Sequence, residues 1–199
     1  MFSTRNRPTL PRWRRARSGA VALGVVALTA PVMAVATTST ASASPTAARA
    51  ASPYCGIVWG SLPKTSSPST RGLVAGLRSG QHPCYDRLVF DIGDGSGTVG
   101  YDVRYVDKVT NPASGVTVPV AGGARLQITI HAPATKQYPA GGSTTFNGWS
   151  TFRQVKWVSS FEGYTDVGLG VRARLPMRVF TLPHAAGGQR LVVDVAHRW

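Results

Sequence analysis

The chain has 199 residues and a formal net charge of +14, with 22 lysine and arginine residues against 8 acidic ones. Its 22 glycines and 14 prolines argue against a mainly helical protein, because both residues break helices. Two cysteines are too few for a disulfide-rich miniprotein or a four-cysteine zinc site. The length favours one domain, with or without a tail. So high a positive charge is typical of nucleic-acid-binding proteins, a hypothesis that the order of residues along the chain can test.

The start of the chain has the three parts of a secretory signal peptide. Arginines without any acidic residue fill residues 1–18, an apolar stretch covers 19–36, and Ala41-Ser42-Ala43 matches an A-x-A cleavage site. We therefore expect cleavage after residue 43, and export as a secreted protein. An uncleaved membrane anchor is the alternative, although Pro31 and the alanine-rich composition make the stretch a poor one.

Removal of residues 1–43 would change the charge argument. It would leave 16 basic and 8 acidic residues, a net charge of +8. Exported proteins rarely meet nucleic acid, and the remaining sequence has no RRM, KH or helix-turn-helix pattern, so we expect no nucleic-acid partner. Residues 44–53 are mainly serine, alanine, proline and threonine and predict a short disordered lead-in. The predicted folded domain is then 54–199, long enough for one good core.

The two cysteines of an exported chain are expected to pair. A bond between Cys55 and Cys84 would close a loop of about 30 residues, which the chain-entropy model values at roughly 3–4 kcal/mol. It would tie the Pro- and Ser-rich segment 60–70 to the start of the main sheet. A reactive thiol or a metal ligand is the alternative, but no C-x-x-C motif and no nearby histidine and cysteine cluster supports it.

Most of the predicted domain alternates apolar and polar residues with a period of two, the pattern of strands with one buried face. The clearest runs are 87–92, 101–105, 125–131 and 190–195, and further strands are expected at 151–161, 165–174 and 177–182. Glycine, proline and asparagine turn signals separate them, at 93–97, 111–112, 122–123, 141–142 and 187–188. A short helix is expected only near 70–78, where Gly72 and Gly76 weaken it. The predicted fold class is therefore all-β, an antiparallel sandwich or barrel.

Two of these strands share the six-residue pattern R-L-V-x-D-[IV]. It occurs in Arg87–Ile92, where the sheet region opens, and again in Arg190–Val195, close to the C-terminus. Two related halves that form two packed sheets would produce such a repeated pattern. Chance similarity between two strands would produce it as well.

Several longer blocks resemble a known family. Residues 82–91 (HPCYDRLVFD) and 100–106 (GYDVRYV) look like the opening of the AMIN-like domain of actinobacterial envelope proteins. Its second half is similar to residues 161–170 (FEGYTDVGLG), 176–180 (PMRVF) and 190–197 (RLVVDVAH). The resemblance covers roughly 72–197 and implies an antiparallel β-sandwich related to the AMIN domain, a targeting module of amidases and secretins that associates with peptidoglycan. It supplies no catalytic residues. The cysteine pair and the segment around Tyr54 and Trp59 are additions to the family pattern.

A search for catalytic and metal-binding motifs finds few candidates. The histidines, at positions 82, 131, 184 and 197, form no H-x-x-x-H or H-E-x-x-H motif, and no G-x-S-x-G motif is present. Glu162 could pair with Asp166 like the carboxylates of a glycosidase, but a turn-capping or salt-bridging role is favoured. The loop Asp94-Gly95-Ser96-Gly97 lacks the ligands that calcium needs. We therefore expect no enzyme, no metal and no cofactor.

Arginines near the C-terminus indicate binding instead. Between Asp166 and Asp194 the chain contains no acidic residue and has arginines at 172, 174, 178 and 190. Arg172 and Arg174 would share one face of the expected strand 165–174. An exposed pair of guanidinium groups can bind a carboxylate or a phosphate, as found on peptide stems and wall polyol phosphates outside the cell.

These features predict a non-catalytic, cell-envelope-associated module that binds peptidoglycan or another anionic wall polymer. The predicted ligand-binding residues are Arg172, Arg174, Arg178, Tyr164 and Trp149. Trp59 would join them, since exposed aromatic rings can stack on sugars. A solvated basic face with the aromatic side chains in the core is the alternative for each residue. Two other functions stay open, a cell-wall hydrolase or other secreted enzyme and a secreted protein-binding or inhibitor domain. A membrane contact is expected only if the signal segment is not cleaved.

Overall fold

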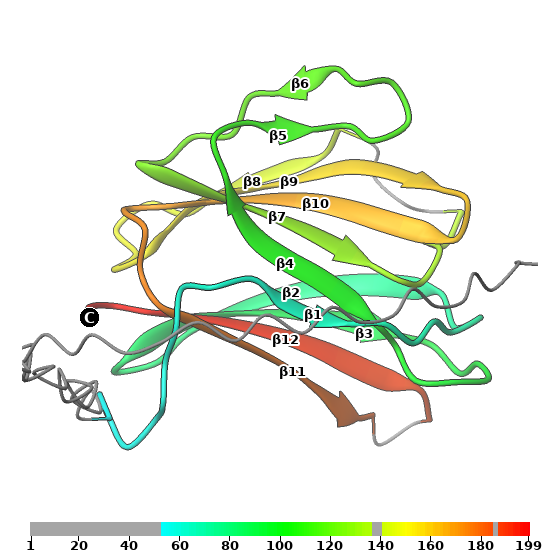
Figure 1. Ribbon diagram of the computed structural model, residues 1–199, viewed down its shortest axis with the longest axis horizontal. Helices are drawn as coiled ribbons and strands as arrows, with labels where there is room; N and C mark the ends of the chain where they lie inside the picture. The colour runs from blue at the N-terminus through cyan, green and yellow to red at the C-terminus, as the bar shows by residue number, and fades with distance from the viewer. Residues whose placement is uncertain (1–52, 137–140, 185–186) are drawn as a thin grey trace, which may run out of the picture. The chain divides into compact units, whose positions relative to one another are not determined.

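The computed structural model describes residues 53–136, 141–184 and 187–199. The predicted signal peptide, its cleavage site and most of the predicted lead-in lie outside the described residues. Two antiparallel sheets pack face to face (Figure 1), so the all-β fold class and the β-sandwich are confirmed. The described residues contain no helix long and apolar enough to cross a membrane.

Six strands form one sheet, in the order β1-β4-β7-β10-β9-β8. Their bounds are Lys64–Ser66 for β1, Tyr101–Val106 for β4, Ala124–Ile130 for β7, Ser143–Thr145 for β8, Phe152–Phe161 for β9 and Tyr164–Val171 for β10. Four strands form the second sheet, in the order β11-β12-β3-β2. Their bounds are Val74–Gln81 for β2, Tyr85–Ile92 for β3, Met177–Pro183 for β11 and Gln189–Ala196 for β12. A small hairpin of β5 (Val109–Thr110) and β6 (Thr117–Val118) covers part of the outer face of the six-stranded sheet.

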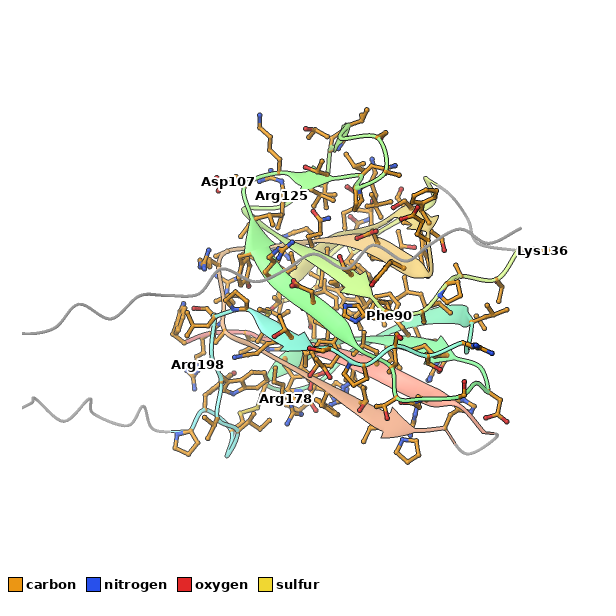
Figure 2. All side chains as sticks on the ribbon, turned by 45° about the vertical axis from the view of Figure 1, so that its right-hand side comes forward. Phe90, Asp107, Arg125, Lys136, Arg178 and Arg198 are labelled. Atoms are coloured by element: carbon orange, nitrogen blue, oxygen red, sulfur yellow. A yellow bond between two sulfur atoms is a disulfide. The ribbon has the colours of Figure 1, made fainter. Side chains whose placement is uncertain are left out.

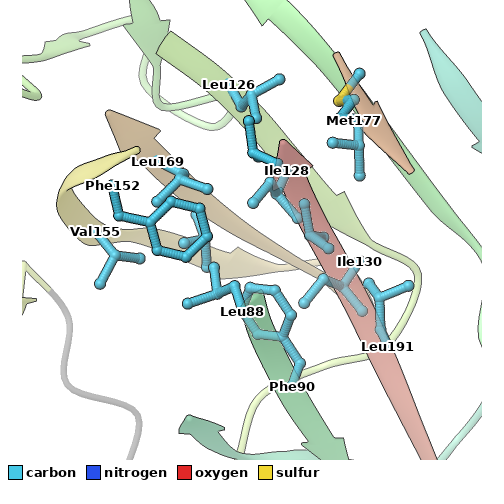
Figure 3. Packing of buried hydrophobic residues seen from close by; sticks show 14 of the residues in the cluster. Leu88, Phe90, Leu126, Ile128, Ile130, Phe152, Val155, Leu169, Met177 and Leu191 are labelled. Carbon is cyan, nitrogen blue, oxygen red and sulfur yellow. The ribbon is translucent and has the colours of Figure 1, made fainter. Parts of the chain in front are cut away.

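One apolar core fills the space between the two sheets (Figure 3). Leu88 and Phe90 of β3 and Leu191 of β12 face Ile128 and Ile130 of β7, and all five side chains are fully buried. Burying a side chain of this size stabilises the fold by about 2 kcal/mol. The strands predicted at 87–92, 125–131 and 190–195 are confirmed. Burial alternates along β3 and β7 as the pattern predicted, whereas every residue of β12 from Leu191 to Ala196 is buried.

The helix predicted near 70–78 is wrong. Residues Val74–Gln81 form β2, which pairs antiparallel with β3 and has a register shift between Val74 and Gly76. A glycine inside a strand often marks such a bulge, whereas two glycines weaken a helix. Pairing with β3 satisfies the backbone of this segment and overrides its weak local pattern.

The strand predicted at 165–174 is too long. β10 ends at Val171, β11 begins at Met177, and residues 172–176 cross from the six-stranded sheet to the four-stranded one. Tyr105 holds this crossing, because its hydroxyl donates to the carbonyl of Leu175 at 2.6 Å and accepts from the Leu175 N–H at 3.0 Å. Arg172 and Arg174 therefore lie on a connection and do not share a strand face.

The predicted disulfide between Cys55 and Cys84 is confirmed, with the two Cα atoms 6.5 Å apart. Cys84 directly precedes β3. The chain that follows Cys55 runs to Gly60, which exchanges two backbone hydrogen bonds with Met177 at the edge strand β11. The disulfide thus fastens the segment 53–60, an addition to the family pattern, beside the four-stranded sheet.

Candidate functional site

The outer face of the four-stranded sheet carries arginines, aspartates and aromatic rings. The register of β3 and β12 sets Asp194 opposite Arg87 and Arg190 opposite Asp91. On the other side of β12, Arg178 of β11 also lies opposite Asp194. Figure 2 shows Arg178 on this sheet. We call the four arginines that project from this surface the arginine face: Arg78, Arg87, Arg178 and Arg190.

Asp194 is fully buried and holds two of these arginines. Arg87 donates from Nε to Oδ1 at 2.7 Å and from Nη2 to Oδ2 at 2.9 Å. Arg178 donates from Nε to Oδ2 at 2.7 Å. The hydrogen bond with Asp194 is the main cause that raises the pKa of Arg87, so this guanidinium stays charged despite its partial burial. One carboxylate between two guanidinium groups leaves a local charge of +1.

Aromatic rings surround both guanidinium groups. The Cζ atom of Arg178 lies 5.5 Å from the ring centre of Trp59, 5.2 Å from that of Tyr85 and 5.0 Å from that of Phe180. The Cζ atom of Arg87 lies 5.2 Å from the ring centre of Tyr85 and 5.7 Å from that of Phe180. Trp59 comes from the segment that the disulfide fastens. These cation–π contacts hold the guanidinium planes in fixed orientations.

A second carboxylate, Asp91, completes the charges of this surface. Arg78 donates to it from Nε at 2.7 Å and from Nη2 at 2.6 Å, and this bonding holds the pKa of Asp91 below its usual value. Arg190 lies opposite and donates from Nη2 to the carbonyl of Pro183 at 2.9 Å. Four arginines and two aspartates give the surface a net charge of +2. Side-chain exposure is 57% for Arg78 and 31% for Arg178, so both reach solvent.

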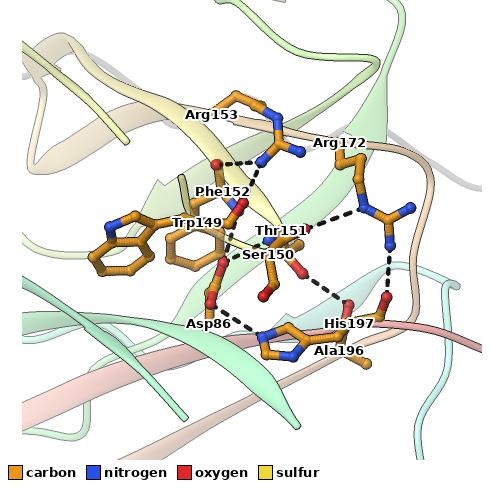
Figure 4. Close-up of polar contacts among 9 residues, drawn as sticks. All are labelled: Asp86, Trp149, Ser150, Thr151, Phe152, Arg153, Arg172, Ala196 and His197. Carbon is orange, nitrogen blue, oxygen red and sulfur yellow. Dashed lines mark hydrogen bonds and ion pairs between the residues drawn. The ribbon is translucent and has the colours of Figure 1, made fainter. Parts of the chain in front are cut away.

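The predicted binding residue Arg172 has structural partners. It donates from Nε to the carbonyl of Ser150 at 3.1 Å and from Nη2 to the carbonyl of His197 at 2.6 Å (Figure 4). These bonds join the chain just before β9 to the chain just after β12. The guanidinium group therefore links the two sheets, which leaves fewer of its donors for a ligand.

Asp86 lies beside this link, at the centre of a buried network (Figure 4). Its carboxylate accepts from the N–H groups of Thr151 at 2.7 Å and Phe152 at 2.8 Å, and lies 3.1 Å from Nε2 of His197. The hydroxyl of Thr151 donates to the carbonyl of Ala196 and not to the imidazole. Asp86 thus fastens β3 to the start of β9 and, through His197, to the end of β12. Among these contacts no hydroxyl nucleophile is bonded to the Asp-His pair.

Arg174 and Trp149 occupy different surroundings. The Cζ atom of Arg174 lies 4.9 Å from the ring centre of Tyr105, which belongs to the six-stranded sheet. Trp149 is half-buried and packs against the core. Its ring centre lies 4.7 Å from that of Phe146 and 6.0 Å from that of Phe152. Its environment is that of a core aromatic residue. Of the predicted ligand-binding residues, Arg178 belongs to the arginine face and Trp59 packs beside it.

Tyr164 lines a pocket of about 300 Å³ on the outer face of the six-stranded sheet. The hairpin between β9 and β10 turns at Glu162 and Gly163, both with positive φ, which makes Phe161 and Tyr164 cross-strand partners. Their side chains are 56% and 45% exposed. The ring of His131 packs edge-on against Tyr164, with ring centres 5.2 Å apart, and so supports one wall of the pocket.

Asp166 lines the same pocket and is only 3% exposed. Thr129 donates its hydroxyl to Oδ1 at 2.7 Å, and Ser159 donates its hydroxyl to Oδ2 at 3.2 Å. Burial raises the pKa of Asp166 above its ordinary value, and these hydrogen bonds oppose the rise. Glu162, which the sequence paired with Asp166, lines the pocket too. Thr129 and Ser159 were not predicted, because only the register of β7, β9 and β10 brings them to Asp166.

No group of three or more histidine, cysteine, aspartate or glutamate residues within the described part of the chain is arranged to hold a metal ion.

The outer faces of the two sheets differ in chemistry. One presents guanidinium groups among aromatic rings, and the other presents a pocket with two carboxylates and two exposed rings.

Comparison with known proteins gives one match. The family model of the AMIN-like domain matches residues 72–197. No curated protein and no solved structure matches the chain significantly. The matched range starts just before β2, ends just after β12 and thus includes the main strands of both sheets; among the strands of the described residues, β1 alone lies outside it. Because the match covers more than half of the sequence, the chain belongs to the AMIN-like domain family.

Proposed function

We propose that this chain is an exported, non-catalytic module that binds peptidoglycan or another anionic wall polymer through the arginine face. Membership of the AMIN-like family indicates a cell-envelope-associated binding module. The disulfide fits an oxidising, extracytoplasmic location. The observation that carries the finer proposal is the set of four arginines with only two aspartates on one sheet face.

The geometry of the arginine face suits a bound anion. Each guanidinium group can present two parallel N–H donors to a carboxylate or phosphate, and this geometry is lost when arginine is replaced by lysine. Asp194 and the surrounding rings fix Arg87 and Arg178 before any ligand arrives. Less side-chain freedom is then lost on binding, which favours affinity.

The test measures how much purified protein sediments with isolated wall sacculi. We expect binding at low ionic strength that weakens as salt is added, because exposed charges are screened over about 8 Å at physiological salt. Arg178→Gln and Arg190→Gln should each weaken retention about fivefold, which corresponds to ~1 kcal/mol. Equal retention of both variants and the unchanged protein would overturn the proposal.

Arg104→Gln provides the matched control. Arg104 is also an exposed, ion-paired arginine, but it lies on β4 in the other sheet, with Asp102 at 3.2 Å. Its replacement removes the same charge and should leave retention unchanged. Sacculi stripped of phosphate-bearing polymers separate the two anion sources: retained binding assigns the carboxylates of peptidoglycan, and lost binding assigns the wall phosphates.

A wall hydrolase is the second candidate function, favoured by the pocket that Glu162 and Asp166 line together. Two carboxylates are the usual catalytic groups of glycoside hydrolysis. The hydrolase hypothesis predicts that labelled wall releases soluble fragments, and that Glu162→Gln and Asp166→Asn both abolish the release. A binding module predicts no release from any of the three proteins.

A further inference from the structure

The pocket beside Tyr164 offers an unusual set of groups for a protein with so much positive charge. Its side chains include two carboxylates, from Glu162 and Asp166, and the exposed rings of Phe161 and Tyr164. The lining within the described residues contains no lysine, arginine, histidine or side-chain amide. The pocket therefore presents hydrogen-bond acceptors, hydroxyls and aromatic faces, but no cation.

This composition matches a ligand that only donates hydrogen bonds. Ionised carboxylates accept and cannot donate, and the hydroxyls of Thr129 and Ser159 already donate to Asp166. A sugar ring would bring acceptors as well as donors and would find few donors here. An ammonium group has three donors and no acceptor, and its charge is attracted to aromatic faces.

We propose that this pocket binds an organic ammonium group, such as the amine of a lysine-like side chain. The ammonium would lie against the Asp166 carboxylate, while the rings of Phe161 and Tyr164 would contact the aliphatic chain that carries it. Asp166 is only 3% exposed and accepts from two neutral hydroxyls and from the neutral side-chain amide of Gln127, so an incoming cation would be its direct counter-ion.

The charges around Asp166 are compatible with a bound ammonium group as its counter-ion. From β4, Arg104 acts on Asp166 electrostatically, but its guanidinium is ion-paired with Asp102 at 3.2 Å. From the hairpin, Glu162 adds a second negative charge. The raised pKa of Asp166 agrees with a buried carboxyl that lacks a close cation. Bound ammonium would favour the ionised form, and binding should therefore release protons and strengthen as pH rises.

The inference stands apart from the proposed function, because this pocket and the arginine face lie on the outer faces of different sheets. Loss of sacculus binding through the arginine face would leave the pocket intact. Conversely, an empty pocket would not affect the proposal made for the arginine face.

Titration followed by NMR tests the inference with three probes. Nα-acetyl-lysine methylamide should shift the amide signals of Asp166 and Tyr164. Nα-acetyl-norleucine methylamide, whose side chain ends in a methyl group where lysine has its amine-bearing CH₂, should bind more than about tenfold more weakly. The third probe, N,N′-diacetylchitobiose, should leave these signals in place. Equal binding of the norleucine compound, or tighter binding of the disaccharide, would overturn the inference.

Two variants locate the site. Asp166→Asn keeps the side-chain shape and removes the charge, so affinity for the lysine probe should fall more than about tenfold, and the part of its pH dependence that Asp166 causes should disappear. Phe161→Ala changes an exposed residue and should weaken binding without unfolding the domain. Asp107→Asn is the control, since Asp107 is exposed and does not line this pocket. Full affinity in Asp166→Asn contradicts the inference.

Discussion

Arg87 and Asp194 are 107 residues apart in the sequence and directly opposite each other on β3 and β12, joined by two hydrogen bonds of 2.7 and 2.9 Å. The same antiparallel register sets Asp91 opposite Arg190. Both strands have the pattern R-L-V-x-D-[IV], so the arginine of each copy meets the aspartate of the other. The repeated pattern therefore belongs to two neighbouring strands of one sheet, which rules against the alternative of two related halves that form two packed sheets.

Asp194→Asn should strongly destabilise the domain. Two arginines point their donors at this fully buried carboxylate, and the change leaves both charges without their counter-ion. Removing one partner of a buried ion pair costs about 3–5 kcal/mol. We expect the free energy of unfolding in urea to fall by about 3 kcal/mol.

Asp102→Asn serves as the control for this change, because Asp102 pairs with an arginine that is 52% exposed. Its loss should cost less than about 1 kcal/mol. Similar stabilities for the Asp102 and Asp194 variants would show that the buried carboxylate contributes little.

Replacing both disulfide cysteines by serine should destabilise the fold and loosen one wall of the arginine face. The bridge spans 29 residues, for which the chain-entropy model gives about 3–4 kcal/mol. Trp59 packs 5.8 Å from Tyr85 only because the segment 53–60 is held beside β11. Tryptophan fluorescence should therefore report a more solvated Trp59 in the folded double variant. An unchanged spectrum would mean that the segment stays in place without the bridge.

The sequence predicted the sheets better than the surfaces. Alternation identified β3 because Leu88 and Phe90 face the core and burial follows a period of two, whereas on β12 the residues of both faces are buried from Leu191 onward. The same alternation continues through Arg172 and Arg174, where the chain bends and has left the sheet. Local pattern does not reveal where a strand ends, since the end is set by hydrogen bonds to distant residues.

Both candidate sites depend on contacts between distant segments. Arg178 was predicted from its acid-free stretch, but its carboxylate partner could only be identified from the register of β11 and β12. Tyr164 and Asp166 were singled out for their chemistry, whereas the pocket itself needs Thr129 of β7 and Ser159 of β9. The sequence therefore indicated which residues have chemistry suited to a site, but it did not indicate which of them the fold brings together.

Arg172→Ala should lower stability without lowering affinity for wall material. The side chain joins the carbonyls of Ser150 and His197, and losing two charge-assisted hydrogen bonds should cost about 1.5–3 kcal/mol. Urea denaturation measures the first effect and sedimentation with sacculi, below the unfolding transition, measures the second. A variant of normal stability that no longer sediments would assign Arg172 to ligand binding instead.

Asp166 should make the domain less stable as pH rises. Its pKa is raised by burial in the folded state, so between the unfolded value of about 4 and the higher folded value the native state holds a proton that the unfolded chain has lost. In that window the contribution of Asp166 to the free energy of unfolding falls with increasing pH, and above it the loss is complete. Asp166→Asn removes this dependence, and urea unfolding of both proteins between pH 3 and 8, in steps of about half a unit, isolates it as their difference. We expect the free energy of unfolding of the unchanged protein, relative to that of the variant, to fall across the window. If this difference stays constant or rises with pH, the Asp166 carboxylate is stabilised in the fold at least as well as in water.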